Sequence, residues 1–374
     1  MQERKQCVIC ESSQLIPLHT FKNFPMLMGI SADNDKFYDQ VWVICKNCGC
    51  IQLQYLIDLN ELYSIPHNPA VGNMWKLHHE KFAKYVGTYA NTSILEIGGG
   101  NFIIANLICE NEPKIKEYLV YDMNVNYTEN INKKIKIENK IFTENEKIEK
   151  DIDTIVISHT FEHFYDLYTY CNKFNNVLPI GGKLIISLPH IKNWLIDNFT
   201  SALQFEHTYL IDEKNIEYLL SKCGFKLIHI DWFSKYNMFV TFEKQIDINS
   251  IKLINNYKEN LKLYKKFLKF QTKNIENINK KLNKYKDYDH YIFSCHVFTQ
   301  FMLHFGLNET TFKGILDNDI NKQNHRLYGT NLMTFNPSII KDINTPCVIV
   351  QAGVYTSEIS EQLIKLNKNV KLIT

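Results

Sequence analysis

Three consecutive glycines restrict the fold of this chain more than any other feature of its sequence. They follow the apolar run Ile94–Ile97, which carries Glu96, and a stretch with helical spacing comes after them. Glycine lets the backbone of such a turn approach a ligand closely, and the helix after it presents unpaired N–H groups. A second apolar run ends in Asp122, where dinucleotide folds place the acid that binds both ribose hydroxyls. The pattern predicts a cofactor site built on Glu96, Gly98, Gly100 and Asp122.

Residues 88–245 alternate strand-like apolar runs with helical stretches. The predicted strands are SILEIGG, EYLVYDM, DTIVISH, KLIISLP and KLIHIDW. Strands that alternate with helices favour an α/β fold with a parallel, doubly wound (Rossmann-like) sheet. Residues 287–374 have a similar texture, with YIFSC, FKGILDN and PCVIVQAG as strands. We therefore expect a second α/β domain at the C-terminal end.

Two Cys-x-x-Cys pairs near the N-terminus indicate a metal module, and their members are Cys7, Cys10, Cys45 and Cys48. A gap of two residues lets both sulfurs of a pair face one ion, and four thiolates complete the tetrahedral shell of a structural zinc. Such a site leaves no open position for substrate. Unrelated buried cysteines or redox pairs are the alternatives. Cys50 lies next to the second pair and outside the predicted ligand set.

Residues 250–286 contain no Gly or Pro, and their apolar side chains recur at steps of three and four residues. This spacing predicts one long amphipathic helix. A connector that packs on neighbouring domains is the favoured interpretation, and self-association through a coiled coil is the alternative. The expected order is a zinc-binding module (1–62), a helical lead-in segment (63–87), a cofactor-binding domain (88–245), a long connecting helix (246–286) and a C-terminal α/β domain (287–374).

The charge balance argues against nucleic-acid and membrane partners. The chain has 42 basic and 40 acidic side chains, a net charge of +2, so no strong electrostatic footprint is expected. The first residues, MQERKQCVIC, lack the apolar core of a signal peptide. No stretch reaches the ~18 consecutive apolar residues of a membrane-spanning helix. We expect a cytoplasmic protein.

The glycine loop resembles that of class I SAM-dependent methyltransferases. Its glycines occupy the first and third positions, the third glycine of the dinucleotide pattern is absent, and an acid precedes the loop on the strand. The next predicted strand runs into His159-Thr-Phe-Glu-His163, and a Gly-Gly turn and another strand follow in LPIGGKLIISLP. A nicotinamide or flavin cofactor is the alternative. The resemblance implies S-adenosyl-L-methionine as the cofactor, bound by Glu96, Gly98, Gly100, Asp122 and His159.

The order of modules resembles that of the sugar C-methyltransferases, which act on nucleotide-linked keto-deoxysugars. Local matches are the cysteine segment 45–53, the run Phe205-Glu206-His207 and segment 316–330, while Gln204 stands where the family has a tyrosine. The resemblance implies removal of a proton beside a ketone and attack of the enolate carbon on the sulfonium methyl group. O- or N-methylation of a sugar or glycan precursor, and a non-catalytic SAM-fold scaffold, are the alternatives.

The same resemblance points to the residues that would carry this chemistry. His207 is the predicted base or proton shuttle, because imidazole titrates near neutral pH. Glu206 would orient that imidazole or contact a sugar hydroxyl, and His163 is the next catalytic candidate. Tyr63 and His67 would bind substrate by closing the cleft. A solvated pair or a helix-capping histidine is the alternative for these positions.

Overall fold

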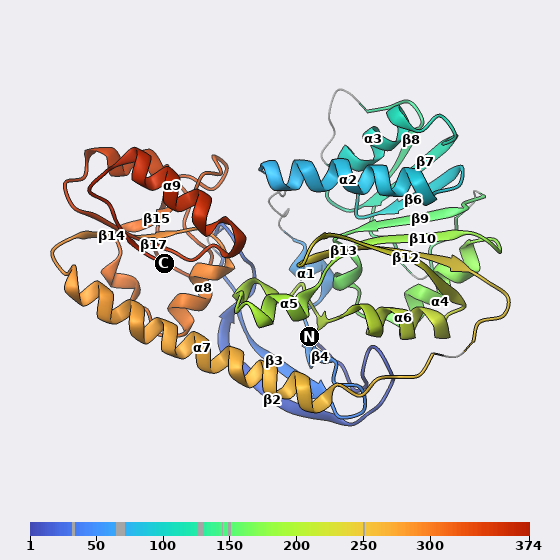
Figure 1. The fold of residues 1–374 in the computed structure, drawn as a ribbon, viewed down its shortest axis with the longest axis horizontal. Coiled ribbons are helices and arrows are strands. Elements are labelled where there is room, and N and C mark those ends of the chain that lie inside the picture. Colours follow the sequence, from blue (N-terminus) through green and yellow to red (C-terminus); the bar gives the residue numbers. More distant parts are fainter. Residues whose placement is uncertain (32–33, 65–71, 126–130, 144, 149–150, 250) are drawn as a thin grey trace. The chain divides into compact units, whose positions relative to one another are not determined.

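The chain forms two compact units in a computed structural model (Figure 1), which describes residues 1–31, 34–64, 72–125, 131–143, 145–148, 151–249 and 251–374. Unit 1 comprises Met1–Pro17, Val43–Asn193 and Glu206–Asn260. Unit 2 comprises Leu18–Trp42, Trp194–Phe205 and Leu261–Thr374. Among the described residues, no helix combines the length and apolar content needed to span a membrane.

Unit 1 is built on a seven-stranded sheet in the order β12-β13-β10-β9-β6-β7-β8. These strands are β6 (Ser93–Ile97), β7 (Glu117–Asp122), β8 (Ile135–Asn139), β9 (Thr154–Ser158), β10 (Lys183–Pro189), β12 (Phe225–Ser234) and β13 (Asn237–Lys244). The five strands from β8 to β10 are parallel, whereas β13 is antiparallel to both β10 and β12. The predicted α/β fold with a doubly wound, Rossmann-like sheet is confirmed.

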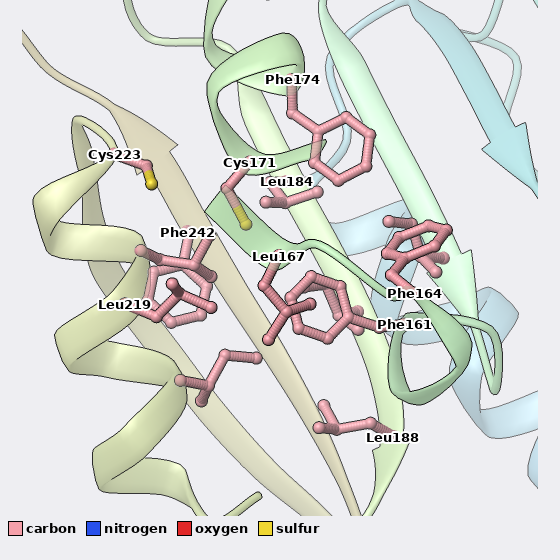
Figure 2. Close-up of a cluster of buried hydrophobic side chains, with 14 of the residues drawn as sticks. Phe161, Phe164, Leu167, Cys171, Phe174, Leu184, Leu188, Leu219, Cys223 and Phe242 are labelled. Carbon is pink, nitrogen blue, oxygen red and sulfur yellow. The ribbon is translucent and has the colours of Figure 1, made fainter. Parts of the chain in front are cut away.

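Helices cover both faces of this sheet because successive strand residues point to opposite sides. Ile94 packs in one cluster with Phe82 of α2, while the next residue, Leu95, belongs to a second cluster with Phe174 of α4 and Leu219 of α6. Figure 2 shows part of this second cluster, where α4 and α6 lie over the strands. The helices of unit 1 are α1 (Leu59–Leu62), α2 (Asn73–Tyr89), α3 (Ile103–Asn111), α4 (Leu167–Val177) and α6 (Glu213–Lys222), whereas α5 (Ile191–Ile196) contributes residues to both units.

Six strands outside the large sheet frame the cysteine-rich segment. A sheet in the order β11-β4-β3-β2 and a pair β1-β5 contain these strands. Their bounds are β1 (Gln2–Glu3), β2 (Leu15–Pro25), β3 (Phe37–Cys45), β4 (Ile51–Leu53), β5 (Tyr55–Leu56) and β11 (Tyr209–Leu210). Strands β2 and β3 each contribute residues to both units.

The long helix α7 (Tyr257–Lys284) begins later than the predicted start near residue 250. The Asn255 side chain accepts a hydrogen bond from the Tyr257 N–H at 2.9 Å, and the Asn256 N–H donates to the Cys48 carbonyl at 3.1 Å. These bonds hold the preceding backbone against the cysteine turn and place the helix start after it. Further along, Ile275, Ile278 and Leu282 of the apolar seam are buried in the core of unit 2.

Unit 2 contains a parallel five-stranded sheet in the order β16-β15-β14-β17-β18. Its elements are β14 (Asp289–Phe293), α8 (Val297–His304), β15 (Gly314–Leu316), β16 (Thr334–Phe335), β17 (Pro346–Val350), α9 (Thr356–Leu366) and β18 (Lys371–Ile373). The predicted strands YIFSC, FKGILDN and PCVIVQAG correspond to β14, β15 and β17.

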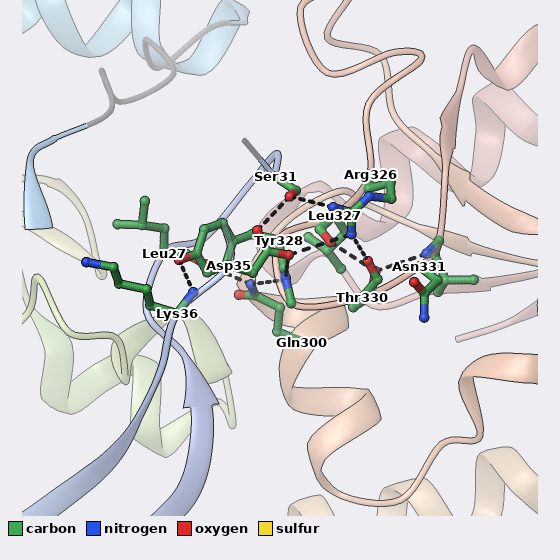
Figure 3. A network of polar contacts seen from close by, with 12 residues as sticks. Leu27, Ser31, Asp35, Lys36, Gln300, Arg326, Leu327, Tyr328, Thr330 and Asn331 are labelled. Atoms are coloured by element: carbon green, nitrogen blue, oxygen red, sulfur yellow. Dashed lines mark hydrogen bonds and ion pairs between the residues drawn. The ribbon is translucent and has the colours of Figure 1, made fainter. Parts of the chain in front are cut away.

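A polar network within unit 2 fastens the segment after β2 to the segment before β16 (Figure 3). The Lys36 N–H donates to the Tyr328 hydroxyl at 2.6 Å, and the Gln300 amide donates to the carbonyls of Leu27 at 2.8 Å and Tyr328 at 2.9 Å. Asp35 accepts from the Gly329 N–H at 2.8 Å. Because Leu27, Gln300 and Tyr328 are buried, their polar contacts fix one arrangement of the two segments.

Candidate active site

The four predicted zinc ligands converge. The sulfurs of Cys7, Cys10, Cys45 and Cys48 all lie within 4.8 Å of one another, with separations of 3.5 Å for Cys7–Cys48 and 3.6 Å for Cys10–Cys45. Cys50 is buried beside this cluster and is not part of it, as expected. Sulfurs at these separations fit the tetrahedral shell of one zinc ion.

A glycine allows the second cysteine turn to close. Gly49 has φ +83°, and a Cβ there would lie 2.5 Å from the Asn256 carbonyl carbon and from the Tyr257 nitrogen. Asn260 also donates to the Gly49 carbonyl at 2.9 Å. Any side chain at this position would therefore push the turn away from the start of α7.

The glycine loop follows β6 at the carboxyl edge of the unit 1 sheet, where open α/β sheets bind their ligands. Gly98 has φ +84°, and a Cβ on it would overlap the Thr160 hydroxyl. A Cβ on Gly99 would lie 2.5 Å from the Glu96 carboxyl carbon, and one on Gly100 would lie 2.7 Å from the carboxyl carbon of Asp122. The loop therefore packs its bare backbone directly on two acidic side chains.

Asp122 lies at the end of β7 and accepts two backbone hydrogen bonds. The Gly100 N–H donates to its Oδ2 at 2.9 Å, and the Asn124 N–H donates to Oδ1 at 2.7 Å. These bonds orient the carboxylate beside the glycine loop, and its remaining lone pairs can accept ribose hydroxyls.

Glu96 is buried beneath the loop. It accepts a hydrogen bond from the Tyr118 hydroxyl at 2.8 Å. Burial raises the pKa of Glu96 to about 7, although the bond from Tyr118 opposes this shift. Glu96 thus supports the loop from below and is wholly enclosed by protein.

A second group of predicted residues meets after β9. The Tyr63 hydroxyl lies 3.1 Å from His163 Nδ1, and the rings of His163 and His207 are 5.7 Å apart. Glu206 and His207 are 6% and 7% exposed, so the pair is buried rather than solvated. Tyr63, His163 and His207 therefore form one acid–base cluster.

Backbone contacts bring these distant segments together. The Tyr209 hydroxyl donates to the Phe161 carbonyl, and the Thr208 N–H donates to the Glu162 carbonyl at 3.4 Å. Strand β11 is thereby tied to the 3-10 turn Phe161–His163 that follows β9. His207, just before β11, is consequently held at the carboxyl edge of the sheet.

Glu162 lies at the centre of this cluster and was not among the predicted site residues. One ligand-type atom from each of Glu162, His163 and His207 lies within 4.8 Å of the others. His159, predicted to bind cofactor, has its Nδ1 3.5 Å from Glu162 Oε1. The signal for Glu162 in the sequence is its place in the polar run after β9. The sequence does not show that its side chain turns toward the histidines.

Two other positions that the sequence analysis named are Gln204 and His67. Gln204 is buried and belongs to unit 2, whereas Glu206 and His207 belong to unit 1. His67 lies outside the residues that the structure describes. The predicted roles of the site residues stay predictions.

Comparison with known proteins agrees with this arrangement. Residues 74–230 match the family model of a methyltransferase domain. The chain therefore contains a SAM-dependent methyltransferase domain. The matched region contains the glycine loop, Asp122 and the cluster at His163 and His207. No curated protein matches the chain.

Solved structures resemble part of this chain. An S-adenosylmethionine-dependent methyltransferase from Mesorhizobium loti has 12% identity and a TM-score of 0.35, covering 44% of this chain and 96% of its own. The N-methyltransferase NodS from Bradyrhizobium japonicum has 12% identity and a TM-score of 0.33, with coverages of 46% and 96%. Human N-acetylserotonin methyltransferase in complex with SAM has 11% identity and a TM-score of 0.37, with coverages of 50% and 63%.

Proposed function

We propose that this methyltransferase transfers the methyl group to a carbon atom of a nucleotide-linked keto-deoxysugar, through an enolate. The observation that carries the proposal is the contact between the Tyr63 hydroxyl and His163 in the cluster that also holds His207. Enolate formation needs a base for the carbon-bound proton and a hydrogen-bond donor for the ketone oxygen. The cluster offers both kinds of group.

Tyr63 is suited to be the donor. Burial, reinforced by the charge of Glu206 and of other nearby groups, raises the pKa of the Tyr63 phenol well above its ordinary value. The phenol therefore keeps its proton at neutral pH and can donate it in a hydrogen bond to a developing oxyanion. This phenol would take the role of the family tyrosine that Gln204 replaces.

His207 is the proposed base. It would take the proton from the carbon beside the ketone, while Glu206 holds a sugar hydroxyl or the imidazole in place. Bound S-adenosyl-L-methionine supplies the methyl group, and the glycine loop and Asp122 fit the adenosine end of such a ligand. The enolate carbon would take the methyl group with loss of its bond to sulfur, and the His207 imidazole would retain the proton.

Proton exchange tests the enolate directly. With nucleotide-linked 4-keto-6-deoxysugars in deuterated water and without SAM, we expect a ring proton to exchange, as followed by NMR. His207→Ala should abolish the exchange, whereas His229→Ala, which changes an exposed histidine on β12, should leave it intact. Methyl transfer to a sugar without any exchange would assign O- or N-methylation. SAM binding without transfer to any sugar nucleotide would assign a scaffold.

We further propose that the four-cysteine cluster holds a structural zinc ion. The support is the set of sulfur separations around Cys7, Cys10, Cys45 and Cys48. We expect one zinc ion per chain by elemental analysis, and loss of that zinc in Cys45→Ser. Cys50→Ser is the matched control, because it removes a buried thiol beside the cluster and should keep the metal. Equal zinc content in the two variants would contradict the assignment.

A further inference from the structure

An unbroken series of polar contacts runs from α2 to Glu162 within unit 1. His78 Nε2 lies 2.8 Å from the Ser187 hydroxyl, which donates to Asn237 Oδ1 at 3.3 Å. The Asn237 amide nitrogen lies 2.6 Å from His159 Nε2. His159 Nδ1 lies 3.5 Å from Glu162 Oε1. Four side chains, from α2, β10, β13 and the turn after β9, thus form a series that ends on the Glu162 carboxylate.

The direction of every hydrogen bond in the series follows from its neighbours. Ser187 donates to the oxygen of Asn237, so the amide nitrogen of Asn237 donates to His159 Nε2. A neutral His159 then carries its proton on Nδ1, the atom that faces Glu162. Burial lowers the pKa of His78 to about 2, so His78 is neutral and its single proton, on Nε2, points to Ser187.

This series orients side chains and does not conduct protons. The Asn237 amide has no proton that it can pass on at neutral pH, so a proton cannot travel from His78 to His159. The effect of the series is to present an N–H donor to Glu162. Such a fixed donor sets the position of the carboxylate.

Glu162 is an ionised carboxylate in a buried place. It is 1% exposed, and its Oε2 has no hydrogen-bond partner among the described residues. Burial alone would raise the pKa of Glu162, but the hydrogen bond from His159 and the charges of His163 and His207 outweigh burial and lower it. The carboxylate therefore stays charged while one of its oxygens has no donor.

The other titratable groups that face Glu162 are phenols. Tyr63 and Tyr209 both interact electrostatically with it. Burial raises the pKa of both phenols well above their ordinary value, so they are neutral near pH 7. The imidazoles of His159, His163 and His207 are thus the groups placed to interact with the negative charge of Glu162.

We propose that Glu162 is a positioning residue of the methyl-transfer centre, fixed by the series from His78, whose negative charge makes His207 a stronger base. The proposal rests on the proposed function only in taking His207 as the proton acceptor. A carboxylate oxygen of Glu162 lies within 4.8 Å of a ring nitrogen of His207. At this distance the carboxylate can stabilise the imidazolium that forms when His207 gains a proton.

A purely structural role would not require this charge. In Glu162→Gln, the amide oxygen can still accept from His159 Nδ1, so the series and the turn Phe161–His163 can persist without the negative charge. This substitution therefore separates charge from shape. It also keeps the number of heavy atoms in a buried site, which limits any packing loss.

Histidine titration by NMR tests the proposal without any sugar substrate. In zinc-loaded, histidine-labelled protein, His207 is assigned from the signal that disappears in His207→Gln. We expect Glu162→Gln to lower the pKa of His207 by about one unit or more, because the imidazolium loses a nearby negative charge. An unchanged His207 pKa in a folded Glu162→Gln protein would overturn the proposal, whatever the enzyme methylates.

Two further variants test whether the shift of the His207 pKa is specific to Glu162 and to the series that fixes it. Asn237→Ala leaves Glu162 in place but removes the bond that fixes His159, so we expect a smaller shift of the His207 pKa in the same direction. Glu213→Gln is the matched control, because Glu213 contacts His190 at 2.9 Å and should leave His207 unchanged. Thermal melting confirms that each variant is folded.

The same three side chains could instead bind a divalent cation. Mn²⁺ distinguishes a metal site from a positioning role, because a carboxylate ligand suits this ion and the thiolate cluster does not. If Mn²⁺ broadened the His163 and His207 signals selectively, and Glu162→Gln abolished that effect, Glu162 would be a metal ligand and the proposal would be wrong. We expect no selective broadening.

Discussion

The five parallel strands of the unit 1 sheet and the five strands of the unit 2 sheet share one order, but the two sheets differ at their carboxyl edges. Strands β8-β7-β6-β9-β10 of unit 1 and β16-β15-β14-β17-β18 of unit 2 both follow the order 3-2-1-4-5. In each sheet an aspartate follows or ends the second strand, Asp122 in unit 1 and Asp317 in unit 2. Each accepts a backbone N–H at 2.9 Å from the loop after the first strand, from Gly100 and Cys295 respectively.

The difference lies in what surrounds these aspartates. Unit 1 has three glycines in the loop, whereas unit 2 has Ser294-Cys295-His296. In unit 2, the Lys322 ammonium lies 3.7 Å from Asp317 and donates to the Cys295 carbonyl at 3.1 Å. An internal cation thus neutralises the acid that unit 1 presents beside its glycine loop. Two sheets with the same strand order can thus differ in the loop and the charge at the edge where ligands bind, and a cofactor site depends on both.

The largest expected effect is at the glycine loop. Gly98→Val places a β-branched side chain at φ +84° and against Thr160, so we expect SAM affinity to fall more than about 100-fold. Gly181→Val is the matched control, because Gly181 has φ +80° but nothing within 4 Å of its would-be Cβ. Calorimetric titration with SAM measures both. Equal loss in the two variants would attribute the effect to backbone strain alone.

The buried acid beneath the same loop should give unit 1 a pH-dependent stability. The folded pKa of Glu96 is raised to about 7 from an ordinary 4.5, so its stabilising contribution is present below pH 4.5 and is lost as pH rises through 7. The variant Glu96→Gln should not show this loss. Between pH 4 and pH 8, its free energy of unfolding should therefore rise by about 3 kcal/mol relative to that of the wild-type protein.

Urea unfolding of the SAM-free protein at several pH values measures this gain. Glu213→Gln should show the opposite sign, because the hydrogen bond from His190 lowers the pKa of Glu213 to about 2. The contribution of Glu213 is present above its unfolded pKa and disappears as pH falls through 2. Parallel pH curves for the wild-type and Glu96→Gln proteins would refute the assignment for Glu96.

A smaller effect separates the two aspartates. Asp122→Asn should weaken SAM binding about 10- to 100-fold, because a charged acceptor for the ribose hydroxyls is lost. Asp317→Asn should leave SAM binding unchanged and lower the free energy of unfolding by about 1–3 kcal/mol, since Lys322 loses its counter-ion. Reduced SAM affinity in Asp317→Asn would break the comparison between the two edges.

Much of this fold follows from local sequence. The runs at residues 93–97, 117–122 and 154–158 are short, apolar and followed by turn or polar residues, so they predict buried parallel strands. The set of four zinc ligands also follows from the sequence, because two Cys-x-x-Cys turns can bind one ion in common. By contrast, β8 was not predicted, because Ile135–Asn139 alternates charged and apolar residues at the sheet edge.

The cluster could be predicted only in part. The sequence predicts His163 and His207 as polar residues near strand ends. Their close approach, however, depends on β11, a two-residue strand that pairs with β4. Glu162 and Asn237 could not be assigned, because their roles arise from side-chain directions and from the β12–β13 hairpin. Sequence spacing carries no information on such long-range side-chain contacts.

The number and location of the SAM sites test most directly whether the edge of the unit 1 sheet alone binds SAM. Calorimetry of the zinc-loaded chain should find one SAM per chain, lost in Gly98→Val and retained in Asp317→Asn and Gly181→Val. Two SAM molecules per chain, or binding that survives Gly98→Val and disappears in Asp317→Asn, would contradict the claim that the unit 1 edge alone binds the methyl donor.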